Sequence, residues 1–589
     1  MNWKKSIFTI VLMVLGAGMF PLGAATPLKL ATTIDYLDYA FEDGAAEFPE
    51  YYPLELWEQR LRELSEAGIE KVYLRVNACG LTLYPTRVSA PYGDEYGNHS
   101  VFWTCGAPRL IRTMERYNPL TETIRLGHKY GMEVWCWESL FDDAANWFHI
   151  NRTEKPAEFA KYGCFPMMDP FFRKNPDGYA MLDPRRGVSE EEARKINQRI
   201  ADKHIGAIRL RSAKPRPEAA LAQMTRENLR ILVSDDNINF RRYEGDFELK
   251  TSREGDRNVL EITGLDIPES YLKLVPADSF GTDFGFVVDE FRGDDLQLFA
   301  VDGERLPANW MVDALSKTVD GTITFVLVGE LGWDYKRNSL GIFKGELVGE
   351  DRKPYYFHGM AEFNVPKTRQ HKLERFQELL EYDFDGYIFD IRNHSRMLHP
   401  ERYGYNPEVR EACLKRYGFD IWKDDFDREL LLEVRADAVS DFLAECRRLA
   451  KRPLFLGASQ LGLEGAQPRR YDLYGGLPWQ YRKLFASGAI DGVMMMGADY
   501  PESFTPEVTG GREVVIGSFR EMLDLHRSGS YDLGADLEKL AAMPKVSEVQ
   551  LYEALVFTQN PEKYFPVLKA FADKQKKVAP ASTGRRSGE

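Results

Sequence analysis

Apolar and polar positions follow a repeated order of amphipathic helix and apolar strand along much of the chain. Residues 53–68 carry apolar side chains at helical spacing and end at a glycine, and residues 69–77 form a largely apolar run that is typical of a buried strand. The same order recurs at 118–139, 373–392 and 477–497. Such alternation predicts a parallel sheet covered by helices.

Further apolar runs complete the set of strands. The runs at 28–35, 452–459 and 548–557 bring the count to seven, and the run at 512–519 offers an eighth. No glycine-rich phosphate loop follows the first strand, as would be expected in an open doubly wound sheet. Seven or eight such units therefore predict an α/β fold of the (β/α)8 TIM-barrel class.

Residues 205–350 interrupt this plan. Short β-like runs are separated there by Asp-Asp, Asp-Gly and Gly turns, without helices between them, which predicts an inserted all-β sandwich or jelly roll. The insertion falls between the third and fourth barrel strands. The predicted order is a signal peptide at 1–25, the first part of the barrel at 26–204, the inserted β-sandwich domain at 205–350, the second part of the barrel at 351–575 and a disordered tail at 576–589.

The first residues have the pattern of an export signal, with a basic start, an apolar stretch and small residues at Gly23 and Ala25. The apolar stretch is short for a membrane span, and a retained N-terminal anchor is the alternative. We therefore expect a secreted or periplasmic protein that has no membrane span after the signal is removed.

Composition and cysteine content narrow the partners and cofactors. The 589 residues carry a formal net charge of −14, which gives no support for nucleic acid or an anionic membrane as a partner. Six cysteines, at 79, 105, 136, 164, 413 and 446, are too few for a disulfide framework, although a bridge between the first two is compatible with an oxidising compartment. No CxxC or HExxH pattern appears, so we expect no metal at the active site and no organic cofactor. Calcium binding by the acidic turns of the insertion stays open. The oligomeric state stays open.

The most distinctive candidate chemistry follows the apolar run at 387–389. Asp390, Arg392 and His394 come at alternate positions, so an extended chain places them on one side. Because barrel enzymes act at the carboxyl ends of their strands, we expect Asp390 to be a nucleophile or charge-stabilising carboxylate, with Arg392 and His394 gripping the substrate. The alternative is an Asp-Arg pair that only orders the loop.

Other strand ends supply further candidates. Glu138 and Glu553 are the candidate general acids or bases, because glycosidic bond cleavage needs one carboxylate to protonate the leaving oxygen while another attacks or activates water. The candidate substrate-binding residues are Asp35, Tyr36, Arg75, Asn77, Trp137, Trp479 and Tyr552. Trp137, Trp479 and Tyr552 offer flat faces to sugar rings. Structural alternatives remain open: Glu138 as a helix cap, Glu553 in an ion pair inside the barrel, and the aromatic side chains in the core.

A family resemblance is carried by the runs DFDGYIFDIRNHS, YGYNPEVREACLKRYGFDIWKDDFD, GMEVWCWES and YEALVF. They resemble the glycosyl-hydrolase-like TIM-barrel proteins of bacteria, described as family-10-like glycosyl hydrolases, over most of both barrel parts. The resemblance implies a secreted carbohydrate-active barrel in which Asp390 matches the acid that closes the DG-x-x-FD pattern. The long insertion departs from the family, and its SDDNINF and YLKLVP runs resemble a galactose-binding-type sandwich.

The sequence thus predicts an exported glycoside hydrolase that cleaves a polysaccharide or oligosaccharide with a pair of carboxylates. One rival is a non-catalytic glycan-binding protein on a TIM-barrel scaffold, which would bind sugar without releasing product. A second rival is a metal-dependent hydrolase or an esterase, for which no GxSxG pattern is present.

Overall fold

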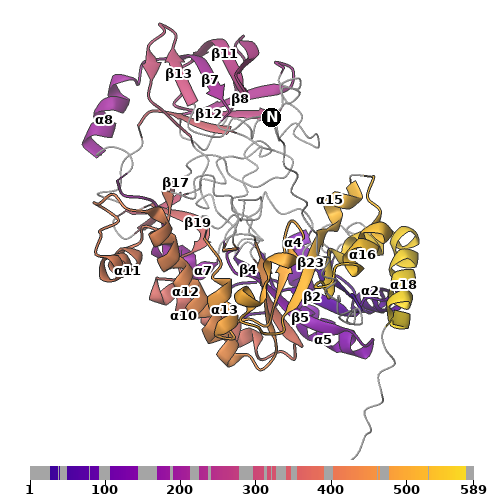
Figure 1. The fold of residues 1–589 in the computed structure, drawn as a ribbon. Helices are drawn as coiled ribbons and strands as arrows, with labels where there is room; N and C mark the ends of the chain where they lie inside the picture. The colour runs from indigo at the N-terminus through magenta and orange to yellow at the C-terminus, as the bar shows by residue number, and fades with distance from the viewer. Residues whose placement is uncertain are drawn as a thin grey trace, which may run out of the picture.

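The computed structural model of the chain is dominated by a barrel of parallel strands with its surrounding helices (Figure 1). The structure describes residues 27–36, 39, 50–78, 80–91, 106–143, 169–185, 190–212, 225–235, 241–276, 296–310, 315–319, 322–326, 340–346, 355–390, 402–459, 462–463, 477–527 and 529–578.

Eight parallel strands close into a barrel. In spatial order they are β1 (Lys29–Ile34), β2 (Lys71–Arg75), β5 (Glu133–Ser139), β20 (Gly386–Asp390), β21 (Leu454–Ala458), β22 (Gly492–Met495), β23 (Val515–Glu521) and β24 (Glu548–Tyr552). The last strand pairs with the first, which completes the ring. The predicted barrel class is confirmed as a closed eight-stranded parallel barrel with helices, and the run at 512–519 supplies one of its strands.

Helices cover the outside of the barrel, with α10, α12 and α13 along one side and α2, α5 and α18 along another (Figure 1). The described helices of the barrel parts are α2 (Leu54–Glu66), α4 (Gly106–Arg116), α5 (Pro119–Lys129), α7 (Pro170–Lys174), α10 (Pro366–Leu379), α11 (Pro407–Tyr417), α12 (Arg428–Leu449), α13 (Tyr481–Ala486), α14 (Pro506–Thr509), α15 (Met522–Arg527), α16 (Leu533–Ala541), α17 (Ala554–Gln559) and α18 (Pro561–Val578). α18 continues three residues into the expected disordered tail, and residues 579–589 lie outside the described part.

The start of α5 and the end of α2 show how local sequence determines where the helices begin and end. The Asn118 side chain caps α5 by accepting a hydrogen bond from Leu120 N at 2.9 Å, and Pro119 occupies the first helical position. Gly68 follows α2 with φ of +96°, and a Cβ on it would clash with Ala572 of α18. The first and last described helices of the barrel therefore pack together where the ring closes.

An ion pair lies inside the barrel near the amino-terminal ends of its strands. Lys71 Nζ is 2.6 Å from Glu548 and 3.8 Å from the centre of the Trp135 ring, and the Tyr73 hydroxyl also donates to Glu548. Trp135 contacts Tyr73 and Phe455 with ring centroids 5.8 and 4.5 Å apart, and all five side chains are buried. This end of the interior is a packed core, so a site belongs at the carboxyl ends of the strands.

Two antiparallel sheets occupy the chain between β5 and β20, after helix α8 (Glu190–Arg199). One has the order β10-β11-β7-β13-β14 and the other β15-β18-β12-β8-β9. Their strands are β7 (Ile205–Arg211), β8 (Leu229–Ser234), β9 (Arg241–Arg242), β10 (Glu248–Glu254), β11 (Arg257–Ile267), β12 (Tyr271–Pro276), β13 (Leu296–Ala300), β14 (Arg305–Leu306), β15 (Ala308–Trp310) and β18 (Leu340–Lys344). Buried apolar side chains from both sheets join one core cluster.

A further sheet joins segments that the sequence analysis assigns to different domains. The strands β6 (Tyr179–Met181), β16 (Leu315–Val319), β17 (Thr322–Val326) and β19 (Tyr355–Ala361) pair in the order β17-β16-β19-β6. The run that begins at residue 322, expected among the strands of the insertion, therefore belongs to a sheet that also contains β6. Pairing between segments so far apart depends on tertiary contacts that a local pattern does not contain.

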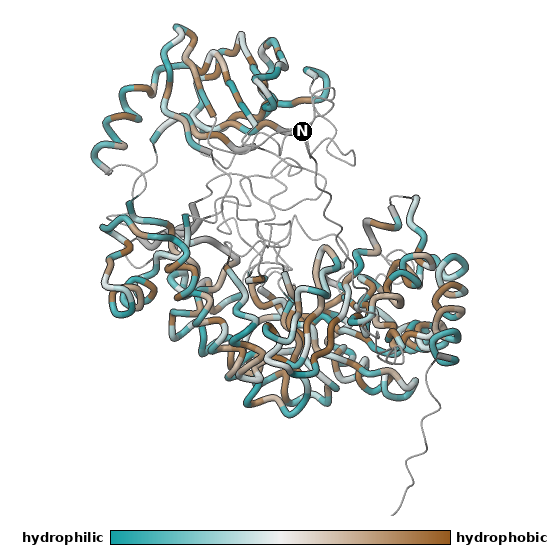
Figure 2. Tube along the Cα trace, viewed as in Figure 1, coloured by the Kyte–Doolittle hydropathy of each residue, from teal (hydrophilic) through white to brown (hydrophobic). Residues whose placement is uncertain are grey.

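Apolar residues concentrate along the barrel strands, and hydrophilic ones are frequent on the surrounding helices (Figure 2). This distribution matches strands buried on both faces in a parallel barrel. Within the described residues, no helix combines the length and the apolar character needed to cross a membrane.

Candidate functional site

Asp390 faces the barrel interior at the carboxyl end of β20. Two residues of the same strand, Tyr387 and Phe389, point outward, with ring centroids 5.2 and 5.4 Å from Phe376 of α10. Because side chains alternate along a strand, Asp390 points inward. Its carboxylate is buried, and the Ser139 hydroxyl donates to Oδ2 at 3.4 Å.

The backbone of Ser139 is held by Asn77 on β3 (Asn77–Ala78). Asn77 Oδ1 accepts from Ser139 N at 2.8 Å, and Asn77 Nδ2 donates to Ser139 O at 2.9 Å. Gly457 of β21 leaves room beside the acid, since a Cβ there would lie 3.2 Å from Asp390 Oδ1. The amide of Asn77 thus binds protein backbone with both of its polar atoms, which departs from the substrate contact expected of it.

Arg75 lies between two carboxylates at the ends of the first three barrel strands. Its NH1 is 2.6 Å from Asp35 Oδ2, its NH2 is 3.1 Å from Asp142 Oδ2, and its Nε donates to Asn77 O at 2.9 Å. All four residues are buried. Asp35 and Arg75 do reach this end of the barrel as expected, but they bind each other, and Asp142 completes the cluster.

Two buried aromatic side chains pack beside Arg75. The rings of Trp137 on β5 and Tyr552 on β24 meet edge to face with centroids 5.7 Å apart, and the Arg75 guanidinium lies 5.8 Å from the Trp137 ring. Phe519 of β23 packs next to them, with its ring 5.8 Å from Tyr552. Three different strands therefore bring apolar ring surfaces to the end of the barrel where Asp390 lies.

Glu521 is a further carboxylate at this end, and it is one that the sequence analysis missed. It is the last residue of β23 and pairs in register with Tyr552. Arg520 bonds outward to Asp536 of α16 at 3.4 Å, whereas Phe519 contacts Tyr552, so alternation places Glu521 on the inward face. Glu521 is partly exposed. The expected strand stops at residue 519, and continuing its alternation by one step would have found this acid.

Glu553 directly follows β24 and precedes α17. The run at 548–557, expected as one strand, divides into β24, which ends at Tyr552, and α17, which begins at Ala554. The Glu553 side chain is buried and makes no hydrogen bond to the first turn of α17. Glu553 is therefore another acid at the end of the barrel where Asp390 and Glu521 lie.

Glu138 lies on the helix side of β5 and is not brought together with Asp390. Its Oε1 is 3.4 Å from Arg375 NH2 on α10, and Arg375 NH1 is 3.3 Å from Asp169. Asp169 in turn bonds His371 at 2.8 Å, and all four side chains are buried. The catalytic role expected for Glu138 conflicts with this placement, because alternation along β5 turns the carboxylate away from the interior.

Burial and ion pairing shift the pKa values of Asp169 and Arg375 in opposite directions. Burial is the largest influence on Asp169 and acts to raise its pKa, but the His371 hydrogen bond and the Arg375 charge outweigh it, and the pKa lies below the usual value. Burial likewise acts to lower the pKa of Arg375, and the carboxylates of Glu138 and Asp169 raise it instead. The balance therefore favours the charged forms of Asp169 and Arg375.

We expect Asp169 to make stability depend on pH in the acid range. Its folded-state pKa lies below the reference value of 3.8, so its ionised form stabilises the fold above that pH and loses this effect as pH falls through the folded-state pKa. The difference in unfolding free energy between wild type and Asp169→Asn, measured in urea, should shrink below pH 3.8. A difference that stays constant into that range would contradict ionised pairing.

Tyr36 and Trp479, both expected to bind substrate, pack against other aromatic side chains. The Tyr36 ring lies 4.2 Å from Trp57 of α2, and burial, assisted by Tyr117, raises the pKa of Tyr36 well above its usual value. Trp479 is buried with its ring 6.4 Å from that of Phe141. Arg392, His394 and the signal peptide at 1–25 lie outside the described residues.

The described residues contain no group of three His, Cys, Asp or Glu side chains arranged to hold a metal ion. Cys136, Cys413 and Cys446 are free and buried, and burial raises the pKa of the Cys136 thiol. Cys79 and Cys105 lie outside the part of the chain that is described.

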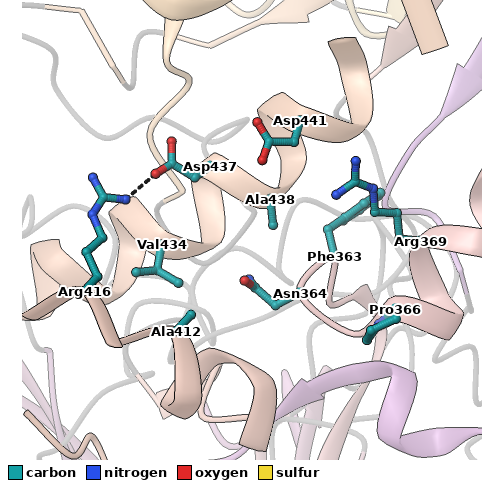
Figure 3. Close-up of a pocket in the computed structure, with 10 residues that line it drawn as sticks. All are labelled: Phe363, Asn364, Pro366, Arg369, Ala412, Arg416, Val434, Asp437, Ala438 and Asp441. Atoms are coloured by element: carbon teal, nitrogen blue, oxygen red, sulfur yellow. Dashed lines mark hydrogen bonds and ion pairs between the residues drawn. The ribbon is translucent and has the colours of Figure 1, made fainter. Parts of the chain in front are cut away.

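A cavity of about 340 Å³ lies in the outer helical layer between α10, α11 and α12 (Figure 3). It is lined by Phe363, Asn364, Pro366, Arg369, Ala412, Arg416, Val434, Asp437, Ala438 and Asp441. Its charged groups have protein partners: Arg416 pairs with Asp437, and Arg369 lies 3.0 Å from Glu445. The cavity is lined by these helices and by the segment that precedes α10, and it includes none of the strand-end residues described above.

Comparisons with known proteins give no family for the chain. No family model matches it, and no curated protein matches it. Among solved structures, it is similar to a rhamnosidase from Novosphingobium sp. PP1Y, with 9% identity and a TM-score of 0.32 over 91% of this chain and 55% of that one. It is also similar to the phospho-2-dehydro-3-deoxyheptonate aldolase of Thermotoga maritima, with 12% identity and a TM-score of 0.15 over 64% and 98% of the two chains. The chain thus spans about half of the rhamnosidase, and similarities at this level identify no activity.

Proposed function

We propose that the protein is a glycoside hydrolase whose active site lies at the carboxyl ends of the barrel strands. The observation that carries this proposal is the set of carboxylates that separate strands bring to one end: Asp390 on β20, Glu521 on β23 and Glu553 after β24. The rings of Trp137 and Tyr552 lie at the same end. Carboxylates from different strands beside flat apolar surfaces fit glycosidic bond cleavage.

Asp390 acts in this proposal as the nucleophile or the charge-stabilising carboxylate. The hydrogen bond from the Ser139 hydroxyl orients the carboxylate for either role. Glu521 acts as the general acid that protonates the leaving oxygen. Its partial exposure supports this assignment, because a general acid must recover its proton from solvent in every cycle. Glu553 is the alternative acid.

We expect Glu521→Gln to slow the cleavage of unactivated glycans by about 10²–10⁴-fold. An aryl glycoside with a nitrophenolate leaving group should be affected far less, because that group departs without a proton. The measurement is kcat on both substrates, with Glu553→Gln as the matched comparison. If Glu553→Gln rather than Glu521→Gln shows this dependence on the leaving group, the general acid is Glu553.

We also propose that the two five-stranded antiparallel sheets between β5 and β20 form a galactose-binding-type β-sandwich that contributes to glycan binding, and that the protein is exported. The two antiparallel sheets with a common core support the first statement. The basic and apolar leader with small residues near 25 supports the second. N-terminal sequencing of the protein recovered outside the cytoplasm tests export, and an intact leader would contradict cleavage.

Product release from a broad panel of glycans tests the proposed activity. Wild-type protein should release new reducing ends from at least one member of the panel. Saturable binding without release would instead favour the non-catalytic glycan-binding alternative. Failure both to bind and to cleave would contradict both functions.

A further inference from the structure

The cavity between α10, α11 and α12 combines a buried apolar floor with a charged rim (Figure 3). The floor includes Val434 and Ala438 of α12 and Phe363 from the segment before α10, all of which are buried. The rim includes Arg416 and Asp441, which are exposed. The cavity volume of about 340 Å³ lies within the range of about 300–1,000 Å³ that is typical of small-molecule sites. The cavity can therefore admit a small ligand that has both apolar and polar surface.

Asn364, which lines the cavity, is oriented by a buried ion pair. Its Nδ2 donates to Glu362 Oε1 at 2.9 Å, and Glu362 Oε2 accepts from Arg435 Nε at 2.8 Å. Glu362 and Arg435 are both buried. A carboxylate only accepts hydrogen bonds, so the NH₂ group of Asn364 faces Glu362 and the amide oxygen points away from it. The cavity lining thus contains an amide whose orientation is fixed from behind, as a binding site requires.

The rim supplies both hydrogen-bond donors and acceptors. Figure 3 shows Arg416 and Asp437 at one end of the cavity and Arg369 at the other. Arg416 pairs with Asp437, and Asp441 lies 3.3 Å from Lys483 of α13. A guanidinium has several N–H donors and a carboxylate several lone pairs, so one ion pair does not use the full hydrogen-bonding capacity of either group. A ligand in the cavity therefore meets donors and acceptors that stay held in place by neighbouring helices.

We propose that this cavity is a carbohydrate-binding site separate from the strand ends, an inference that rests on the proposed glycoside hydrolase function. A sugar hydroxyl both donates and accepts, so it can bind the carboxylates, guanidinium groups and amide that share the cavity. The C–H surface of a sugar ring matches the apolar floor, and a few placed polar groups beside apolar surface are typical of small-molecule sites. A glycan long enough to reach both sites would bind more tightly than one that occupies the strand-end site alone.

Hydrogen–deuterium exchange of the full-length protein locates the bound sugar. The probes are oligosaccharides of cellulose, xylan, mannan, galactan and chitin. With at least one of them, backbone amides of α11 and of residues 428–441 in α12 should exchange more slowly, because a ligand stabilises the elements that it contacts.

The outcomes separate this inference from the function on which it rests. Slower exchange that is confined to the carboxyl ends of the barrel strands overturns the inference and leaves the hydrolase proposal standing. Slower exchange nowhere in the protein, with any of the probes, contradicts the proposed function, and the inference falls with it.

Ala438→Met tests whether the cavity itself holds the sugar. Methionine adds an unbranched apolar side chain at the floor without a change in charge, and it is a good helix former. The sugar concentration that half-saturates the slower exchange in α11 and α12 should rise at least about tenfold. Ala444→Met is the matched control, because it makes the same change on α12 at a half-buried position outside the described lining of the cavity. Wild-type protection in Ala438→Met would contradict the inference.

Asp441→Ala tests the rim and decides the question if Ala438→Met does not fold. Asp441 is exposed, so the loss of its pair with Lys483 should leave stability nearly unchanged. Sugar binding at the cavity should weaken severalfold, because a hydrogen-bond acceptor is removed. Asp573→Ala is the matched control, since it removes the same charge from an exposed position on α18. Equal weakening in both variants, or none in Asp441→Ala, would contradict binding at this rim.

Discussion

Replacing Asp390 with asparagine should abolish cleavage and leave glycan binding nearly intact. The side chain faces the interior at the end of β20 and is 1% exposed, with the Ser139 hydroxyl at 3.4 Å. Asparagine keeps the shape and can accept the same hydrogen bond, but it cannot attack a sugar carbon or balance a positive charge. We expect kcat to fall by at least about a thousandfold, with Kd for the substrate changed little.

Glu138→Gln provides the matched control for this prediction. Both acids follow apolar runs in neighbouring strands, and Glu138 is in register with Phe389, the residue before Asp390. Because Glu138 faces α10, its glutamine variant should retain wild-type kcat per folded molecule and lose stability instead. Loss of turnover in a stable Glu138→Gln protein would return the catalytic role to Glu138. Persistent cleavage by Asp390→Asn would move the chemistry to Glu521 and Glu553.

Replacing Arg375 with methionine should lower the free energy of unfolding by about 3–5 kcal/mol. The guanidinium lies 3.4 Å from Glu138 and 3.3 Å from Asp169, and none of the three side chains is more than 3% exposed. Methionine fills much of the same space, but two buried carboxylates lose their shared cation. Chemical denaturation of wild type and variant measures the effect.

Two further variants test whether the loss of stability in Arg375→Met comes from buried carboxylates that no longer have a cationic partner. Adding Glu138→Gln to Arg375→Met removes one of the stranded carboxylates, so the double variant should be more stable than Arg375→Met alone. Arg62→Met, which breaks the exposed pair with Glu66 at 3.9 Å, should cost less than about 1 kcal/mol. A cost for Arg375→Met as small as that of Arg62→Met would contradict a buried ionic network between β5 and α10.

Much of the barrel could be predicted from local pattern. Asn118, Pro119 and Gly131 mark the two ends of one helix, and the apolar runs mark all eight barrel strands. These signals are local because backbone capping, helical spacing and strand burial each involve residues close together in sequence. The pairing of residues 322–326 with β16 and, through β19, with β6 was not predictable in this way, because it depends on which distant segments meet.

Part of the candidate site could likewise be predicted from the sequence, and part depends on the tertiary structure. The sequence by itself placed Asp390, Glu553, Arg75, Trp137 and Tyr552 at strand ends, and parallel strands bring such ends to one side of a barrel. It could not tell Asp390 from Glu138, since each is an acid that follows an apolar run. Only closure of the barrel and the register of β5 with β20 decide that one faces the interior and the other faces Arg375. The same closure brings Asp35 and Asp142 to Arg75 from three different strand ends, and so determines that this guanidinium binds protein carboxylates.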